Sequence, residues 1–304
     1  MSRRKPDTAC GVIVINKHAG VTSHRIVQIM RRLYDMPRIG HTGTLDPMAT
    51  GVLPVLLGRA AKACEYITAE DKEYTATLKL GITTDTEDIW GGVLTECADI
   101  PSQADVIGAA RSFTGEITQV PPMYSAIKVD GRKLVDIARE GGTVERTARS
   151  VTVYSLDCEC VTDDTYRLNV RCSKGTYIRT LCADIGKMLG CGAVMSSLTR
   201  TRCGAFTLDD AYTTDELDAM DFDKRLTLPK PAESLFYDLP AVDVSDFYAK
   251  LCRGGTELYQ RKLGTSLDGG TLVRIRQRGE FIALGRVCDF ADGSAIKPEK
   301  IFVL

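Results

Sequence analysis

Residues 40–53 read Gly-His-Thr-Gly-Thr-Leu-Asp-Pro-Met-Ala-Thr-Gly-Val-Leu and hold a single carboxylate, that of Asp46. The glycines permit positive φ angles and close approach by another molecule, and Asp46-Pro47 favours a turn over a helix. A carboxylate presented in this way can act as a nucleophile or as a base. The simpler alternative is a structural turn in which Asp46 bonds its own backbone, and a bare Asp-Pro pair favours that alternative.

Five further residues carry groups that could accompany the carboxylate at a site. An arginine can hold a carboxylate in a bidentate pair, but it can equally contact a phosphate. A tyrosine in a strand or at a helix start more often packs in the core than stacks on a ligand. A lone histidine is more often structural, and a lone leucine is typical of a core. The five candidates are Arg179, Tyr74, Tyr177, His41 and Leu198.

The apolar pattern predicts the elements that must position these residues. Gly11–Asn16 is a β-branched run typical of a buried strand, and Ser23 is predicted to cap a helix that runs through Tyr34. Alternation over 72–81 predicts a strand with Tyr74 on its apolar face. Further strands are expected at 52–57, 124–129, 151–158 and 166–172, and helices at 102–113, at 132–139 and from 173–180 to Gly190.

The order of these elements indicates the fold class. Strands and helices alternate irregularly, without the regular βαβ pattern of a parallel sheet. We therefore predict an α+β fold with a mixed, largely antiparallel sheet and flanking helices. Pro229-Lys230-Pro231 predicts a linker, and strand-like segments at 272–275, 281–285 and 301–304 predict a small β-rich domain. The expected division is a catalytic domain at 1–231 and a C-terminal domain at 232–304.

Charge is unevenly distributed along a chain whose net charge is only −1. Residues 1–62 carry ten Lys or Arg against three acids, and 171–202 carry six against one, whereas 209–223 hold seven acids and no base. A basic segment can be merely a solvated face. These two segments also hold the glycine-rich loop and an aromatic motif, a combination that favours a polyanion-binding cleft.

The cysteines and histidines do not suggest a metal site. The eleven cysteines are scattered from Cys10 to Cys288 without a Cys-x-x-Cys pair, so reduced thiols are expected. No apolar run reaches the about 18 residues of a membrane span. The basic start lacks the apolar region of a secretory signal, and a cytoplasmic protein is therefore expected.

Six separated motifs, in order along 11–206, resemble those of the TruB-type pseudouridine synthases. They lie at 16–23, 40–53, 72–74, 119–128, 173–180 and 197–201, and His18 stands where the family has a proline. The resemblance implies a bacterial tRNA pseudouridine synthase that flips uridine 55 out of the T-loop and isomerises it to pseudouridine. More loosely, 279–285 and 296–302 resemble a PUA-like RNA-binding domain.

The resemblance also implies roles for the candidate residues. The reaction breaks and remakes the base–ribose bond, and related bond cleavage uses a carboxylate beside the sugar. The matching group is Asp46, as nucleophile or base, and Arg179 is implied to pair with it and keep it ionised. Tyr74 is implied to stack on the target base and to take its C5 proton. The other implied substrate contacts are Tyr177, which holds the base, Leu198, which closes the pocket, and His41, which contacts displaced nucleotides.

The implied partner is tRNA, bound through its T-stem–loop by a monomer without a guide RNA, a membrane, a metal or any other cofactor. Residues 119–149 are expected to form a flap that contacts the RNA.

Features of the sequence disfavour three alternative functions. A guide-RNA-dependent, dyskerin-like synthase is disfavoured by Met48-Ala49-Thr50 and by the TruB-like insertion at 119–149. A non-catalytic RNA-binding or chaperone protein is disfavoured by the joint presence of Asp46, Tyr74 and Arg179. A nucleotide-binding enzyme is disfavoured because no P-loop occurs and Gly190-x-Gly192 lacks the remaining Rossmann glycine.

Overall fold

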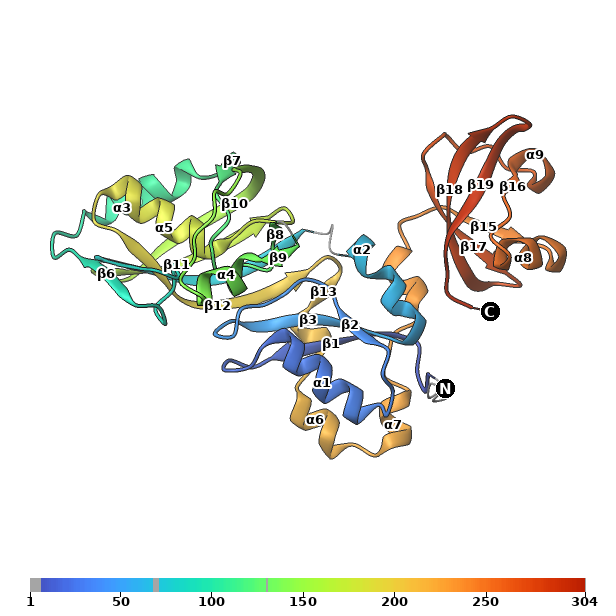
Figure 1. The fold of residues 1–304 in the computed structure, drawn as a ribbon, viewed down its shortest axis with the longest axis horizontal. Helices are drawn as coiled ribbons and strands as arrows, with labels where there is room; N and C mark the ends of the chain where they lie inside the picture. The colour runs from blue at the N-terminus through green and yellow to red at the C-terminus, as the bar shows by residue number, and fades with distance from the viewer. Residues whose placement is uncertain (1–6, 68–70, 130, 304) are drawn as a thin grey trace.

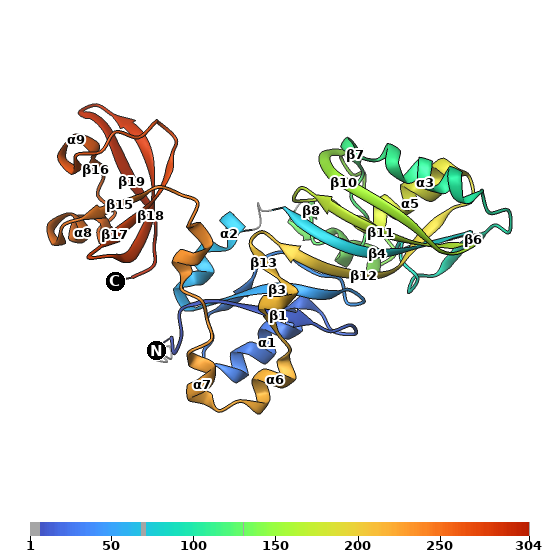
Figure 2. The same cartoon turned by 180° about the vertical axis from the view of Figure 1, so that it is seen from behind.

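The computed structural model describes residues 7–67, 71–129 and 131–303, so the basic start at 1–6 lies outside it. Two β-sheets organise the chain, a large one flanked by helices and a smaller, curled one near the C-terminus (Figure 1). Seen from behind, the small sheet again lies at the opposite end of the molecule from strand β6 (Val93–Glu96) (Figure 2). No helix in the described ranges is long and apolar enough to cross a membrane.

The large sheet has the order β14-β1-β3-β12-β4-β11-β10-β7, with β13 paired to β12 and β2 to β3. The pairs β1–β14 and β3–β12 are parallel and the others are antiparallel. This arrangement confirms the α+β class and the mixed, largely antiparallel sheet. The strands are β1 (Gly11–Lys17), β2 (Ile39–His41), β3 (Thr50–Leu57), β4 (Lys72–Leu80), β7 (Gly115–Gln119), β10 (Arg149–Thr162), β11 (Thr165–Cys172), β12 (Ala193–Cys203), β13 (Phe206–Thr207) and β14 (Ala211–Tyr212).

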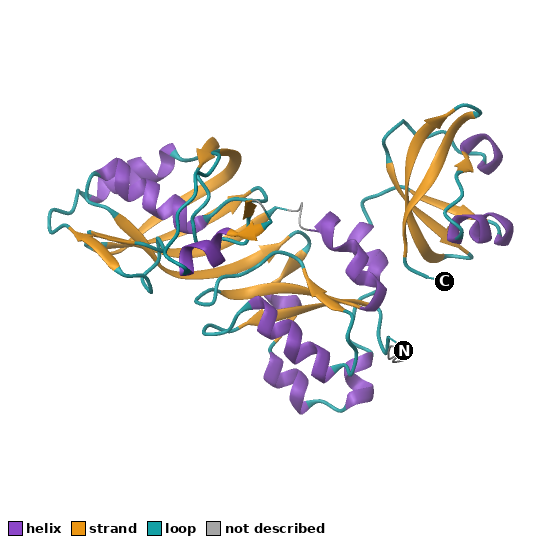
Figure 3. Ribbon diagram, viewed as in Figure 1, coloured by secondary structure: helices purple, strands orange, loops and turns teal. Residues whose placement is uncertain are grey.

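Two groups of helices flank this sheet. Helices α3 and α5 lie together at one end, while α1, α6 and α7 lie beside β1 and β3 (Figure 3). One continuous core joins them, because Met30 of α1 and Ile185 of α5 both pack in the same apolar cluster. The helices and helical turns beside the large sheet are α1 (Ser23–Leu33), η1 (Gly58–Ala63), α2 (Cys64–Ile67), α3 (Gln103–Ser112), α4 (Leu134–Arg139), α5 (Ile178–Leu189), η2 (Leu208–Asp210), α6 (Thr214–Ala219) and α7 (Phe222–Leu226).

Strand β4 carries the alternation that its sequence predicted. Every second residue from Lys72 to Leu80 is buried, and the intervening ones are partly exposed. Tyr74 lies on the buried face and is 9% exposed. Because β4 lies between β11 and β12, its backbone is paired on both sides, and the position of Tyr74 is fixed by the sheet.

The cap of α1 differs from the prediction. The Thr22 side chain, not that of Ser23, accepts the capping hydrogen bond, from the backbone N–H of Arg25 at 3.0 Å. Ser23 instead uses its hydroxyl on Leu45, accepting from the backbone N–H at 2.8 Å and donating to the carbonyl at 3.0 Å. The helix start is thereby tied to the loop that carries Asp46.

The strand expected at 124–129 is also wrong over most of its length. Only a short hairpin forms, from β8 (Lys128–Val129) and β9 (Arg132–Lys133). The carbonyl of Tyr124 accepts a hydrogen bond from Arg179 instead of from a neighbouring strand. Local turn bonds, such as that from the Ser125 N–H to the Met123 carbonyl, use the next backbone groups.

The small sheet has the order β15-β17-β18-β19-β16. The strand expected at 301–304 is wrong, because the last strand begins at Gly293 and ends at Ile301. Beyond it the Phe302 N–H still donates to the Ile282 carbonyl at 2.8 Å, and its buried ring has its centroid 4.9 Å from that of Phe281. The elements are β15 (Ala241–Val244), α8 (Asp246–Arg253), β16 (Leu258–Tyr259), α9 (Gln260–Leu263), β17 (Leu272–Gln277), β18 (Glu280–Phe290) and β19 (Gly293–Ile301).

The stretch predicted as a linker is held against the large sheet. Lys230 exchanges two backbone hydrogen bonds with Val12 of β1, at 2.8 and 2.9 Å. After it, η3 (Ala232–Phe236) places Phe236 in an apolar cluster that joins both sheets. This cluster contains Val12, Val14, Val52, Leu56, Ala60, Ala63, Cys203, Phe206, Ala232, Phe236, Phe281, Leu284 and Phe302.

Candidate active site

The structure brings Asp46 and Arg179 into contact although they are far apart in the sequence. Asp46 lies in the loop between β2 and β3, and Arg179 lies in the first turn of α5. The Arg179 Nε–Asp46 Oδ2 distance is 2.9 Å, and Nη2 lies 3.5 Å from Oδ1. Both carboxylate oxygens are thus held by one guanidinium, while the Asp46 side chain remains 33% exposed.

Arg179 itself is fixed by three further acceptors. Its guanidinium donates to the backbone carbonyls of Thr86 at 2.8 Å and of Tyr124 at 2.7 Å. Its Nη1 also lies 3.7 Å from Oδ2 of Asp88, and the side chain is only 4% exposed. These contacts direct the buried guanidinium toward Asp46 and toward acceptors inside the protein.

Burial raises the pKa of Asp46 above its ordinary value. The Arg179 ion pair opposes this shift, and the nearby carboxylate of Asp88 adds to it. The pair expected between Arg179 and Asp46 is therefore present, but it does not cancel the cost of burying the charge. A raised pKa keeps Asp46 a better proton acceptor than an exposed aspartate.

A buried lysine holds the loop that carries Asp46. Lys17, at the end of β1, is 0% exposed, and its Nζ donates to the carbonyls of Ala49 at 2.6 Å, His18 at 3.0 Å and Pro47 at 3.3 Å. Burial lowers the pKa of Lys17 to about 8, although the nearby Asp46 works in the opposite direction. The carbonyls on either side of Met48 are thus satisfied by one cation, which fixes the turn after Asp46.

A second buried cation holds the loop from the β12 side. Arg200 is 1% exposed and donates to the carbonyls of Val52 at 2.7 Å and Gly43 at 3.2 Å. Gly51 is required here, because a Cβ at this position would lie 2.2 Å from the Arg200 carbonyl oxygen. Arg200 also lies beside the Tyr74 phenol, and burial raises the pKa of Tyr74 to about 12.

The remaining predicted residues border the same region. Leu198 of β12 is 7% exposed and pairs with Ala76 of β4. Tyr177 precedes α5, and its backbone exchanges two hydrogen bonds with the Gln119 side chain, at 3.0 and 3.1 Å. His41 ends β2, and burial together with the Arg200 charge lowers the pKa of His41, so its imidazole is neutral near pH 7.

Sequence reasoning assigned no role to four residues that hold this arrangement, namely Lys17, Asp88, Arg200 and Glu87. Lys17 and Arg200 lie within recognised motifs, and their burial could not be inferred from residue type because Lys and Arg are rarely buried. Glu87 and Asp88 lie in the acidic stretch Asp85-Thr-Glu-Asp88. The Thr86 carbonyl of this stretch accepts a hydrogen bond from Arg179, and the Glu87 carboxylate accepts one from Thr180. The density of acids in Asp85–Asp88 was the signal available in the sequence.

The conformation of Glu87 is fixed by its backbone angle and by two hydrogen bonds. Its φ is 63°, a left-handed value that is uncommon outside glycine. Its carbonyl accepts from the Met195 N–H at 3.1 Å, and its Oε2 accepts from the Thr180 hydroxyl at 2.7 Å. Because Thr180 follows Arg179 on α5, this bond ties the acidic stretch to the turn of helix that carries the guanidinium.

We expect Thr180→Val to lower the single-turnover rate of the reaction at the Asp46 site by about tenfold. Without the Thr180–Glu87 hydrogen bond, the Thr86 carbonyl and the Asp88 carboxylate are no longer held in position against Arg179. Thermal stability should fall by about 1–3 kcal/mol, the cost of leaving Glu87 without its donor. Glu87→Gly removes the carboxylate while keeping a residue that tolerates the left-handed φ. The double variant should be no slower than Thr180→Val alone, and fully additive losses in rate would contradict the coupling.

No group of His, Cys, Asp or Glu side chains in the described residues could hold a metal ion. The cluster around Asp46 instead combines the partly exposed Asp46 carboxylate and the buried Asp88 carboxylate with three buried basic side chains, Lys17, Arg179 and Arg200. Such a site can perform nucleophilic or acid–base chemistry on a polyanion.

Comparison with known proteins decides the family. The model described as "TruB family pseudouridylate synthase (N terminal domain)" matches residues 31–178, and the "tRNA pseudouridylate synthase B C-terminal domain" matches residues 179–234. The chain belongs to the TruB family of pseudouridylate synthases. Membership makes it an isomerase that acts on RNA, as the six motifs led us to expect.

Curated relatives cover nearly the whole chain. A protein of Aromatoleum aromaticum called tRNA pseudouridine synthase B is 43% identical over 279 residues, which are 92% of this chain and 89% of the relative. A protein of the same name from Francisella philomiragia is 41% identical over 291 residues, covering 94% and 93% of the two chains.

Solved structures show the same fold. A chain in the crystal structure of a Cbf5-Nop10-Gar1 complex is 28% identical with a TM-score of 0.72, over 98% of this chain and 88% of that one. A chain in an H/ACA ribonucleoprotein bound to a substrate RNA containing 2'-deoxyuridine is 24% identical with a TM-score of 0.70 and covers 100% of this chain and 93% of that one.

Proposed function

We propose that this chain converts uridine 55 of the tRNA T-loop to pseudouridine, acting alone and without a guide RNA. The relatives that match it over most of its length at 40–43% identity bear the name tRNA pseudouridine synthase B. The observation that carries the chemical part is the Asp46–Arg179 pair, 2.9 Å long, on a loop braced by buried Lys17 and Arg200.

The reaction is an isomerisation, so its atoms balance within the substrate. The N1–C1′ bond of uridine breaks, the base turns, and a C5–C1′ bond forms. The proton on C5 is lost and N1 gains one, so no group donor or redox partner is needed. Asp46 acts at the ribose, either as a nucleophile toward C1′ or as a base toward a sugar proton.

The base pocket we propose lies around Asp46. Tyr74 stacks on the flipped uracil, Tyr177 holds the base and Leu198 closes the pocket with an apolar contact. Since the pKa of Tyr74 is raised to about 12, its phenol is neutral near pH 7, and it accepts the C5 proton only if it passes its own proton on. The neutral imidazole of His41 stacks against displaced nucleotides of the opened loop.

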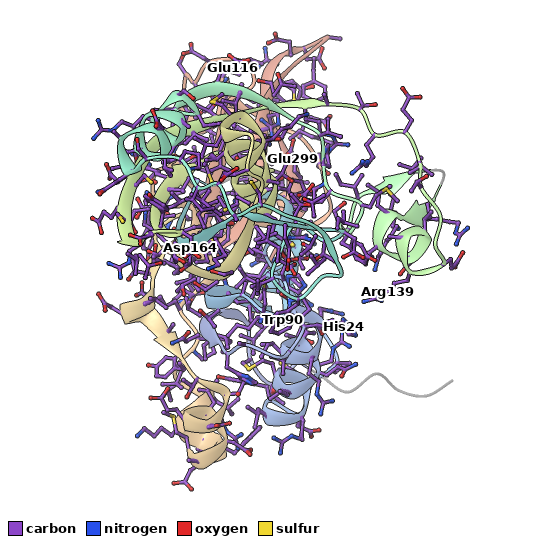
Figure 4. All side chains as sticks on the ribbon, turned by 90° about the vertical axis from the view of Figure 1, so that its left-hand side faces the viewer. His24, Trp90, Glu116, Arg139, Asp164 and Glu299 are labelled. Carbon is purple, nitrogen blue, oxygen red and sulfur yellow. The ribbon has the colours of Figure 1, made fainter. Side chains whose placement is uncertain are left out.

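Phosphate contacts are proposed for the surface around this pocket. Residues 119–149 include the β8–β9 hairpin and α4, which project from the body of the protein near Arg139 (Figure 4). This stretch is rich in basic residues that can follow an RNA backbone. We further propose that 1–231 form the catalytic domain, that 232–304 form a PUA-like domain, and that the protein acts as a monomer.

The direct test is to incubate the purified chain with an unmodified tRNA transcript and to map pseudouridine at single-nucleotide resolution. Modification at position 55 without added guide RNA supports the proposal, and a uridine-55-to-cytidine transcript is the matched control. Activity should persist in a metal chelator. A product found only with a guide RNA, or only in ribosomal RNA, would assign the chain to the guide-dependent class.

Tyr74→Phe separates stacking from proton transfer, because phenylalanine keeps the ring and loses only the hydroxyl. If the hydroxyl relays the C5 proton, RNA affinity should stay near that of the wild type while single-turnover rates fall by about 10²-fold. Tyr74→Ala should in addition weaken binding. Wild-type rates in Tyr74→Phe would reduce Tyr74 to a stacking surface.

A further inference from the structure

The tryptophan of this chain, Trp90, lies in the loop between β5 (Ile82–Thr84) and β6 and is 61% exposed. The sequence contains one tryptophan in all. Figure 4 views the molecule from the end that carries this hairpin and labels Trp90 there. Tryptophan is usually well buried, and exposed apolar clusters commonly mark binding sites. Its exposed apolar neighbours on the hairpin are Ile89, Val93 and Leu94.

The backbone under Trp90 is rigidly built. The Trp90 N–H donates to Oδ1 of Asp88 at 3.0 Å, and the Gly91 N–H donates to the Asp88 carbonyl at 3.2 Å. A Cβ on Gly91 would lie 2.3 Å from the Thr86 hydroxyl, so the chain turns tightly against its own loop. The indole is therefore an exposed ring on a fixed support.

That support is shared with the candidate active site. Asp88 is 8% exposed, and its carboxylate has three partners. Its Oδ1 accepts from the Trp90 N–H at 3.0 Å and from the Thr86 hydroxyl at 2.9 Å, and its Oδ2 faces Arg179 Nη1 at 3.7 Å. Arg179 in turn holds Asp46. The Trp90 backbone is thus joined to the proposed catalytic carboxylate through two side chains, those of Asp88 and Arg179.

We propose that Trp90 is a base-stacking platform for the substrate RNA, at a nucleotide next to the one that is modified; this rests on the proposed function. An exposed indole whose backbone is joined to the Asp46 site offers a flat face on which an unstacked base can lie. The charges around it agree with a base and not a phosphate as the occupant. The neighbouring Asp85, Glu87 and Asp88 are acidic, and their carboxylates accept bonds from Gly92, Thr180 and Trp90 within the protein.

The experiment uses the full-length chain carrying Asp46→Asn, so that RNA binds without turnover. Because Trp90 supplies the tryptophan emission alone, unmodified tRNA should change that emission and should shield the ring from acrylamide. The titration should saturate at the same RNA concentration as an independent filter-binding assay. Saturable filter binding with unchanged emission and unchanged quenching would overturn the proposal.

Substitutions then test the ring in the active enzyme. Trp90→Ala should raise the Kd and KM for RNA by about 5- to 100-fold, the range for loss of one stacked base. Trp90→Phe should retain most of the affinity, whereas Trp90→Leu, apolar but not flat, should behave like alanine. The salt dependence of binding should keep its slope, because no charge is removed. Thermal midpoints should not change for a ring that is mostly in solvent.

Other results point elsewhere. Wild-type affinity in Trp90→Leu would show an apolar contact without stacking, and a fall in kcat at constant KM would show a positioning role; either overturns the proposal. Failure of the wild-type chain to bind or modify tRNA would remove the proposed function itself. That failure is distinguishable, since the filter assay and pseudouridine mapping report it without using Trp90.

Discussion

Asp46→Asn is expected to lower pseudouridine formation by about 10³- to 10⁴-fold or more, the scale on which loss of one member of a catalytic group acts. Asparagine keeps the size of the side chain and can still accept from Arg179, but it is neither a nucleophile nor a base toward the sugar. Single-turnover measurements on unmodified tRNA test this directly. Filter binding should give a Kd close to that of the wild type, because Lys17 and Arg200 still hold the loop.

The control for Asp46 is a nearby acid with no proposed contact to the ribose. Asp85 lies in the same acidic stretch as Asp88, and its Oδ1 accepts from the Gly92 N–H at 2.8 Å. Asp85→Asn retains that acceptor and should leave the rate within about threefold of the wild type. If Asp46→Asn kept a substantial fraction of wild-type turnover, Asp46 could be neither the nucleophile nor the base.

Arg179→Lys should reduce the single-turnover rate by about 10²-fold or more, although the charge is kept. One ammonium cannot reproduce a fork that reaches both Asp46 oxygens and the carbonyls of Thr86 and Tyr124. Binding of RNA should change little if the guanidinium does not contact phosphate. A variant with unchanged rate and weakened, less salt-dependent binding would instead make Arg179 a phosphate ligand.

The pH profile of the Arg179 variants gives an independent readout. In the proposed mechanism turnover requires the Asp46 carboxylate, so the rate should rise with pH through the pKa of Asp46, which burial sets above the ordinary value. Arg179 lowers that pKa, and its replacement by glutamine should move the acid limb to higher pH, with lysine between. A limb that stays in place would mean that another group controls it. Circular dichroism and thermal midpoints must accompany these data, because removing a buried charge can destabilise the fold.

The sequence predicted most of the strands and helices, but it did not predict the buried residues that hold the loop around Asp46. Alternation in β4 and the run in β1 follow from burial of one or both faces of a strand, and such patterns are local. The contact of Asp46 with Arg179 came from motif resemblance and not from spacing, since the two are joined only by the tertiary fold. Local rules could not have placed them together.

The errors share a physical cause, which is that tertiary contacts outcompeted local preference. Ser23 is a good cap by type, but its hydroxyl serves Leu45 and leaves capping to Thr22. Residues 124–129 have strand-like composition, but a guanidinium takes the carbonyl that a ladder would use.

The bonds from Lys17, Ser23 and Arg200 to the loop around Asp46 are made within the protein, before any RNA arrives. The entropy of ordering this loop is therefore lost during folding and not during association. If the chain binds the T-loop as proposed, conformational change on complex formation falls mainly on the RNA, which must unstack a nucleotide to enter a site whose loop is already ordered. A T-stem–loop with weakened stacking around the target should accordingly gain affinity, whereas added rigidity in the protein should bring little.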